Sequence, residues 1–347
     1  MKRAYVAIAA TVGLFALVQV GALALVEPFM DAGYQTVEDP SDPTNSLLYV
    51  AAILVATAVM LGAIKLGVDR LLQVLIVFAA VMLAFYVFSV VAPSAVTYAG
   101  LNVLAVLTAA AIGLGLLFYP EWYVIDTAGV VMGAGAAGLF GISFGLLPAL
   151  LLLVVLAVYD AISVYGTEHM LALASGAMDL RLPVVFVVPL TLSYSFLDAD
   201  GPATLEDEQS EAEQSEDGAT DEQDRGDEDD GDAEGGNGDG DDPFARDAFF
   251  IGLGDAVIPT ILVASAAFFQ PGGAGLLSVP GVALTLPALG AMAGTLAGLL
   301  TLMWMVLEGR AHAGLPLLNG GAIVGYLAGA LLAGVAVVEA LGVAPYL

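Results

Sequence analysis

The sequence predicts an all-α polytopic membrane protein with nine transmembrane helices. Three observations carry this prediction: 59% of the 347 residues are hydrophobic, apolar runs of membrane length recur along the chain, and the basic residues fall on one side of the resulting topology. Soluble domains are seldom this apolar. A run of about 20 apolar residues is what a helix needs to cross a bilayer.

The nine predicted spans are separated by short polar or turn-forming segments. They occupy residues 4–26, 46–66, 71–93, 96–118, 122–142, 146–166, 248–269, 282–306 and 314–340. A tenth apolar stretch, 170–197, is interrupted by Asp179, Arg181 and Pro183. We interpret it as an amphipathic or re-entrant segment beside the sixth span.

The basic residues predict the orientation. With the N-terminus in the cytoplasm, every basic residue falls on the cytoplasmic side, and these residues are Lys2, Arg3, Lys65, Arg70, Arg181, Arg225, Arg246 and Arg310. This distribution satisfies the positive-inside rule. We therefore expect a multi-pass protein of the cell membrane whose C-terminus lies outside. The first span could instead be a signal peptide, since Lys2-Arg3 precedes an apolar run, but its length favours a retained helix.

An acidic segment divides the chain into 1–197, 198–247 and 248–347. The chain has 36 acidic and 8 basic residues, and 22 of the acidic ones lie in 198–247. This segment is too polar to form a core and is predicted to be a disordered spacer, with a regulatory tether as the alternative. The acidic, lysine-poor composition suggests a halophile. Without a basic patch, nucleic-acid binding is not expected.

Cysteine is absent, which excludes disulfides, thiol nucleophiles and cysteine-ligated metals. The two histidines, His169 and His312, form no metal-binding motif. We therefore expect neither a cofactor nor a metal. The chain also contains the pattern Gly141-Ile142-Ser143-Phe144-Gly145, but no histidine is expected near Ser143 to act as its base.

Two aspartates lie within predicted spans. Asp160 is near the cytoplasmic end of the sixth span, and Asp255 is near the cytoplasmic start of the seventh. A carboxyl group in hydrocarbon costs several kcal/mol unless it is paired, protonated or hydrated. At 1.5 Å per residue both lie about 10 Å below the cytoplasmic surface. Antiparallel neighbouring helices would bring them together.

Two carboxyl groups at close range in a low dielectric cannot both ionise, so the pair holds one proton. One group can then take a proton from an attacking water while the other donates to a peptide carbonyl. This predicts peptide hydrolysis without a metal or a covalent intermediate. The alternative is a proton- or ion-coupled transporter, which could use the same pair.

Two further elements accompany the pair. In Gly252-Leu253-Gly254-Asp255 the glycines leave room for a neighbouring backbone. Pro316-Leu317-Leu318 opens the ninth span, where proline fixes the local backbone. Asp126, near the start of the fifth span, could extend a polar path, but we interpret it as an interfacial residue.

These motifs resemble those of the presenilin and signal peptide peptidase family of intramembrane aspartyl proteases, most closely its archaeal members. The resemblance covers nearly the whole chain: nine spans, Tyr159-Asp160 in the sixth, the GxGD motif in the seventh and a proline motif opening the ninth. The family's third motif is Pro-Ala-Leu, whereas this chain has Pro316-Leu317-Leu318.

The resemblance implies a presenilin-like fold and an aspartic endopeptidase of the GxGD type. It implies that Asp160 and Asp255 are catalytic, that Tyr159 and the Gly252-Leu253-Gly254 segment support them, and that Pro316 to Leu318 position the substrate. The implied partners are transmembrane-helix substrates and the lipid bilayer. Nothing in the sequence requires accessory subunits.

Overall fold

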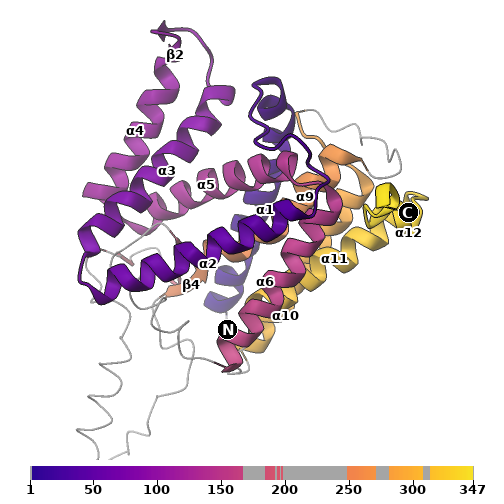
Figure 1. Ribbon diagram of the computed structural model, residues 1–347. Coiled ribbons are helices and arrows are strands. Elements are labelled where there is room, and N and C mark those ends of the chain that lie inside the picture. The colour runs from indigo at the N-terminus through magenta and orange to yellow at the C-terminus, as the bar shows by residue number, and fades with distance from the viewer. Residues whose placement is uncertain are drawn as a thin grey trace, which may run out of the picture.

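The computed structural model describes residues 2–166, 184–191, 194–195, 197, 248–270, 281–307 and 313–346. Within these residues the chain is mostly helical (Figure 1). The first five helices are α1 (Lys2–Asp31), α2 (Thr44–Lys65), α3 (Asp69–Val91), α4 (Val103–Phe118) and α5 (Trp122–Ser143). The others are α6 (Leu146–Gly166), α9 (Leu253–Phe269), α10 (Leu286–Leu307), α11 (Gly314–Leu332) and α12 (Val337–Ala340).

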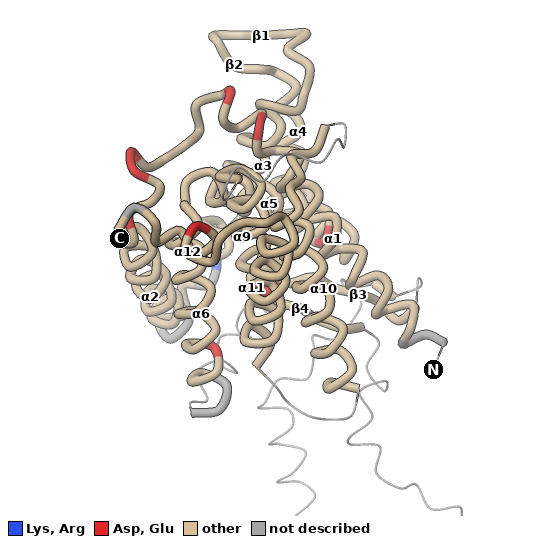
Figure 2. Tube along the Cα trace, turned by 90° about the vertical axis from the view of Figure 1, so that its right-hand side faces the viewer, with Lys and Arg blue, Asp and Glu red and all other residues tan. Residues whose placement is uncertain are grey.

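Seven of the described helices are long and apolar enough to cross a membrane, and α4 and α9 are shorter apolar helices. Each of these nine helices overlaps a predicted span, although the number of crossings remains a prediction. Figure 2 shows how few charged residues the described helices carry. The predicted acidic segment 198–247 and most of 170–197 lie outside the described residues.

Three predicted spans differ from the structure at their ends. Residues 97–102 form a hairpin of β1 (Thr97–Tyr98) and β2 (Leu101–Asn102) ahead of α4. Its two central residues, Ala99 and Gly100, both have positive φ, which gives the tight turn such a hairpin needs. The last span ends at Leu332, and α12 follows after a turn at Gly334.

The third correction concerns the seventh span. Residues Ala248–Gly252 form strand β4, which pairs antiparallel with β3 (Val185–Pro189), and helix α9 begins only at Leu253. Within the described part of the predicted re-entrant segment, Val185–Pro189 thus form a β-strand. Both segments are rich in valine, isoleucine and phenylalanine, which fit a strand as well as a helix, and length alone does not decide between them.

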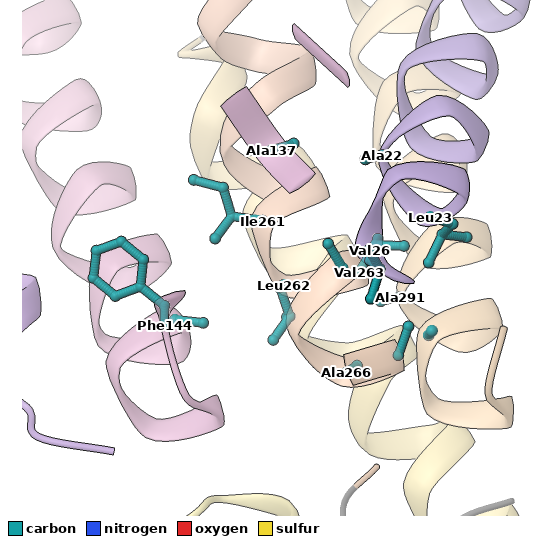
Figure 3. Packing of buried hydrophobic residues seen from close by; sticks show 14 of the residues in the cluster. Ala22, Leu23, Val26, Ala137, Phe144, Ile261, Leu262, Val263, Ala266 and Ala291 are labelled. Atoms are coloured by element: carbon teal, nitrogen blue, oxygen red, sulfur yellow. The ribbon is translucent and has the colours of Figure 1, made fainter. Parts of the chain in front are cut away.

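Helix α9 lies at the centre of the bundle. It packs against α1, α5, α6, α10 and α11, and most of its residues from Ala256 to Ala267 are buried. Figure 3 shows its side chains between Phe144 on one side and α1 on the other, with the labelled residues Ile261, Leu262, Val263, Ala22, Leu23 and Val26. The central position of α9 fixes the start of the helix, where Asp255 lies.

Helices α10 and α11 approach each other most closely. Glycines four residues apart on each helix face the partner's backbone, and they are Gly290, Gly294 and Gly298 on α10 and Gly321, Gly325 and Gly329 on α11. A methyl group added at Gly294 would meet the carbonyl oxygen of Gly321. Small residues at this spacing allow antiparallel helix backbones to touch.

The two ends of the bundle differ. One end, which we term the acid end, holds the start of α1, the end of α6 and the starts of α9 and α11. At the far end, several loops are joined by hydrogen bonds: Thr36 Oγ1 donates to Ser143 Oγ at 3.0 Å, and Tyr346 Oη donates to the Ser41 carbonyl at 2.8 Å. The N-terminal and C-terminal residues therefore lie at opposite ends of the bundle (Figure 1).

Helix α2 is the least buried of the candidate spans. Only 6% of its span residues are buried, compared with 67% for α5. It is attached near its start, where Ser46 Oγ donates to the Pro148 carbonyl at 2.6 Å and the Tyr49 ring packs on Phe140 and Phe144. Most residues from Ala51 onward are exposed.

Candidate active site

Asp160 is buried and lies against the start of α11. Its side chain is 3% exposed, and its Oδ2 accepts a hydrogen bond from the Leu315 backbone N–H at 3.1 Å. The first N–H groups of a helix have no partner within that helix. Asp160 thus supplies the acceptor that the first turn of α11 lacks, and this bond ties α6 to α11 at the acid end.

Asp255 lies in the first turn of α9, two residues after the helix begins. The sequence places it about seven residues into a continuous helix, and the strand β4 accounts for the difference. Its Oδ2 is close to two glycines. A methyl group added at Gly252 would lie 3.5 Å from that oxygen, and one added at Gly314 would lie 3.3 Å from it.

The structure brings the two aspartates together. Asp255 is close enough to Asp160 for their carboxyl groups to interact electrostatically. They also share a neighbour, since Leu315 binds Asp160 while the adjacent Gly314 lies beside Asp255. The start of α11 therefore contacts both acids, which come from α6 and α9.

The proline motif is fixed against two helices. The Leu317 carbonyl and the Leu318 Cα lie against Gly298 of α10, and Leu318 is fully buried. Asn319, one turn after Leu315, donates from Nδ2 to the Leu153 carbonyl of α6 at 2.9 Å. The replacement of alanine by leucine in this motif is accommodated because the Leu317 side chain packs, half-buried, against a neighbouring apolar cluster.

Of the predicted supporting residues, Leu253 and Gly252 are fixed at the start of α9, whereas Gly254 and Tyr159 are exposed. Leu253 donates its backbone N–H to the Val184 carbonyl at 2.8 Å, and its side chain lies beside Gly133. Gly252 caps α9. Gly254 is exposed, and a methyl group there would meet only Ile258, at 3.9 Å. Tyr159 is 38% exposed, on a different face of α6 from its neighbour Asp160.

Sequence reasoning missed Gly314 and Asn319, and it missed the backbone role of Leu315. Leu315 contributes only its backbone, so no side-chain pattern marks it. Asn319 does leave a signal, because it is a lone amide one turn into an apolar helix, and such residues usually bond across to a neighbouring helix. Among the described residues, no group of three histidine, cysteine, aspartate or glutamate side chains could hold a metal ion.

Ser143, the serine of the Gly-x-Ser-x-Gly pattern, lies at the far end and accepts hydrogen bonds from the Thr36 N–H and hydroxyl. These bonds join the loop after α1 to the end of α5. The serine therefore has a structural role at the opposite end of the bundle from the two aspartates.

Comparisons with known proteins identify the family. A family profile described as signal-peptide peptidase, presenilin aspartyl protease matches residues 12–335. A presenilin family intramembrane aspartate protease solved in a C222 space group is 33% identical, with 94% of this chain and 99% of that chain covered and a TM-score of 0.60. A presenilin family intramembrane aspartate protease solved in a P2 space group is 32% identical, with 93% of this chain and 97% of that chain covered and a TM-score of 0.58.

A search of curated proteins finds no match. The profile and the two structures nevertheless agree over nearly the full length, with a mostly helical, polytopic fold. This integral multi-pass membrane protein belongs to the signal-peptide peptidase and presenilin family of intramembrane aspartyl proteases.

Proposed function

We propose that Asp160 and Asp255 are the catalytic pair of a GxGD-type endopeptidase that hydrolyses peptide bonds within transmembrane helices. The observation that carries this proposal is that the carboxyl groups of Asp160 and Asp255 both lie against the first turn of α11, at Leu315 and Gly314. Family membership favours hydrolysis over the ion-coupled transport that the same pair could perform.

The pair works by general acid–base catalysis. One carboxylate accepts a proton from the water that attacks the scissile carbonyl, and the other carboxyl group donates a proton to the carbonyl oxygen and then to the leaving amine. The Leu315 N–H holds Asp160 in place. Gly252 leaves room beside the carboxyl group of Asp255, and Leu253 fixes the start of α9. Gly254 and Tyr159 are exposed and are assigned to contact with the substrate.

The substrate enters as a helix and must unwind locally, because its scissile carbonyl is otherwise hydrogen-bonded within the helix. Pro316 to Leu318 position the unwound segment beside the acids. The acid end faces the cytoplasm of the cell, so cleavage occurs near that surface.

The test is cleavage of a synthetic single-span peptide by full-length protein reconstituted in phosphatidylcholine vesicles. Asp160→Asn and Asp255→Asn should each lower kcat by about 1000-fold, the scale at which acid–base groups contribute. Asparagine is nearly the same size, so thermal unfolding should change little. A transition-state inhibitor of aspartyl proteases should block the unmodified protein.

Two results would contradict the proposal. One is an Asp255→Asn variant that cuts the peptide at the normal rate. The other is vesicle ion flux that depends on both acids in a protein that never cleaves peptide.

A further inference from the structure

Besides Asp160, a second carboxyl group is buried within the described helices. Asp126, one turn into α5, is 8% exposed and lies in a candidate membrane span. The sequence suggests an interfacial residue, and the structure adds that its side chain is buried within the protein. A buried carboxyl group in an apolar helix is costly and is retained when it has a specific partner. Asp126 has one, because its Oδ1 accepts a hydrogen bond from the Val187 backbone N–H at 2.8 Å.

This N–H belongs to strand β3 but points away from its partner strand. The Leu253 N–H bonds to the Val184 carbonyl, which marks these two residues as a hydrogen-bonded pair. In an antiparallel ladder every second residue makes such a pair, so the backbone N–H and C=O of Phe186 point toward β4. The backbone N–H of Val187 therefore points to the opposite side. Asp126 thus supplies the acceptor that β4 cannot provide and joins the edge of the sheet to α5.

Helix α5 holds the same segment at other points. The ring of Phe186, fully buried, lies against Gly129, one turn after Asp126. At the start of α5, Glu121 accepts a hydrogen bond from Ser195 Oγ at 2.7 Å. The Leu253 side chain lies beside Gly133, one further turn along. Since 67% of its span is buried, α5 is a firm support for the sheet.

The sheet leads directly to one of the two acids. Strand β4 ends at Gly252, which caps α9, and Asp255 follows three residues later. A shift of the sheet along α5 would therefore move the first turn of α9. We infer that Asp126 is a positioning residue, which fixes the β3–β4 sheet on α5 and thereby places Asp255 relative to Asp160. This inference rests on the proposed function.

The experiment compares Asp126→Asn with Asp126→Leu in the same vesicle assay. Asparagine keeps an oxygen acceptor and should retain at least about half of kcat, whereas leucine keeps the shape, lacks the acceptor and should lower kcat by roughly 10-fold to 100-fold. KM should change by less than about 2-fold, since the change affects the geometry of the acids. Inhibitor titration counts the active sites, so that loss of folded protein does not enter kcat.

The distribution of cut sites gives a second readout. With the sheet free to shift, Asp126→Leu should cut the peptide at several neighbouring bonds, as mass spectrometry of the products would show. Simple loss of folded protein would not change this distribution. Thr127→Val is the matched control, because Thr127 is exposed on the same helix and its hydroxyl bonds to the Tyr123 carbonyl of its own helix.

Val187→Pro tests the same bond from the other partner. Proline removes the N–H that Asp126 accepts, and it is tolerated where a strand N–H faces away from the ladder. If Asp126→Leu does not fold, comparison of Val187→Pro with Asp126→Asn tests the inference. The double variant Asp126→Leu with Val187→Pro should have a kcat no lower than that of the less active single variant, since both substitutions remove the same bond.

Two outcomes would overturn the inference. In the first, Asp126→Leu (or Val187→Pro, if the leucine variant does not fold) cleaves the peptide at the same rate and the same bonds as Thr127→Val. In the second, Asp126→Asn lowers kcat as much as Asp126→Leu. Failure of the proposed function would look different: the unmodified protein would then not cleave the peptide, or its cleavage would persist in Asp255→Asn.

Discussion

At the scale of single residues, the two acids are held by groups that carry no functional side chain. The Leu315 N–H binds Asp160, and Gly314 lies against Asp255. The carboxyl groups are thus positioned by the backbone at the start of one helix. Any change that adds atoms at this point should alter the geometry of the pair.

Gly314 provides a direct test. In Gly314→Ala the new methyl group would lie 3.3 Å from Asp255 Oδ2 and 3.4 Å from Leu302 Cδ2, so one of them must move by a few tenths of an ångström. We expect kcat to fall roughly 10-fold, because small displacements of catalytic groups are costly. Gly314→Val should lower it further. Vesicle assays of peptide cleavage would measure both effects.

Gly320→Ala is the matched control for this change. It lies on the same helix, and a methyl group there would have no heavy atom within 4 Å. Equal rates for Gly314→Ala and Gly320→Ala would show that Gly314 does not position Asp255.

The sequence predicted which acids meet but not how they are held. Asp160 and Asp255 stand out because carboxyl groups are rare in apolar spans. Leu315 cannot be identified in this way, since every residue of a helix start has the same N–H. Asp126 was visible as an acid, but its partner is a backbone group 61 residues away in the chain.

At the scale of elements, the main difference between prediction and structure is the segment before Asp255. The pattern of Ala248–Gly252 is apolar throughout and continues into α9, so it indicates one long helix. Pairing with β3 overrides that preference, because a strand finds its hydrogen bonds in a distant segment that local periodicity does not reveal. The helix count near the site is unaffected, but the depth of Asp255 along its helix changes.

The glycine contact between α10 and α11 is a second element that the sequence conceals, since the chain has 41 glycines and many are equally spaced. In Gly294→Ala the methyl group would meet the Gly321 carbonyl and the Gly325 Cα, so the helices must separate. We expect the free energy of unfolding to fall by about 1–3 kcal/mol, as for other overpacked sites. Thermal or denaturant unfolding in detergent would measure this.

Loss of this contact should also lower activity, because the Leu317 carbonyl and Leu318 belong to the same seam through Gly298. Gly320→Ala, which faces away from the seam, should leave both stability and activity close to those of the unmodified protein. An unchanged melting curve for Gly294→Ala would contradict the close approach.

At the scale of the whole molecule, the chain ends lie at opposite ends of the bundle, as an odd number of crossings requires (Figure 1). The start of α1 lies at the acid end, and the residues after α12 contact the loop at Ser41. The positive-inside rule then predicts that the acid end is cytoplasmic. Substrates with their N-terminus outside should be preferred.

Reporter fusions test this orientation. A reporter that is active only outside the cell should work when fused after Leu347 and fail when fused before Met1. A reporter active only in the cytoplasm should give the reverse pattern. Cytoplasmic activity of a C-terminal fusion would overturn the predicted orientation and the preference for substrates.

Helix α2 has a consequence for how a substrate arrives. Its hydrogen bond at Ser46 and its ring contacts at Tyr49 are close to its start, and its remaining length has largely exposed side chains. A helix attached mainly near its start can be displaced at little cost. We therefore expect a transmembrane substrate to reach the acids laterally, from the surrounding lipid beside α2, without passing through water.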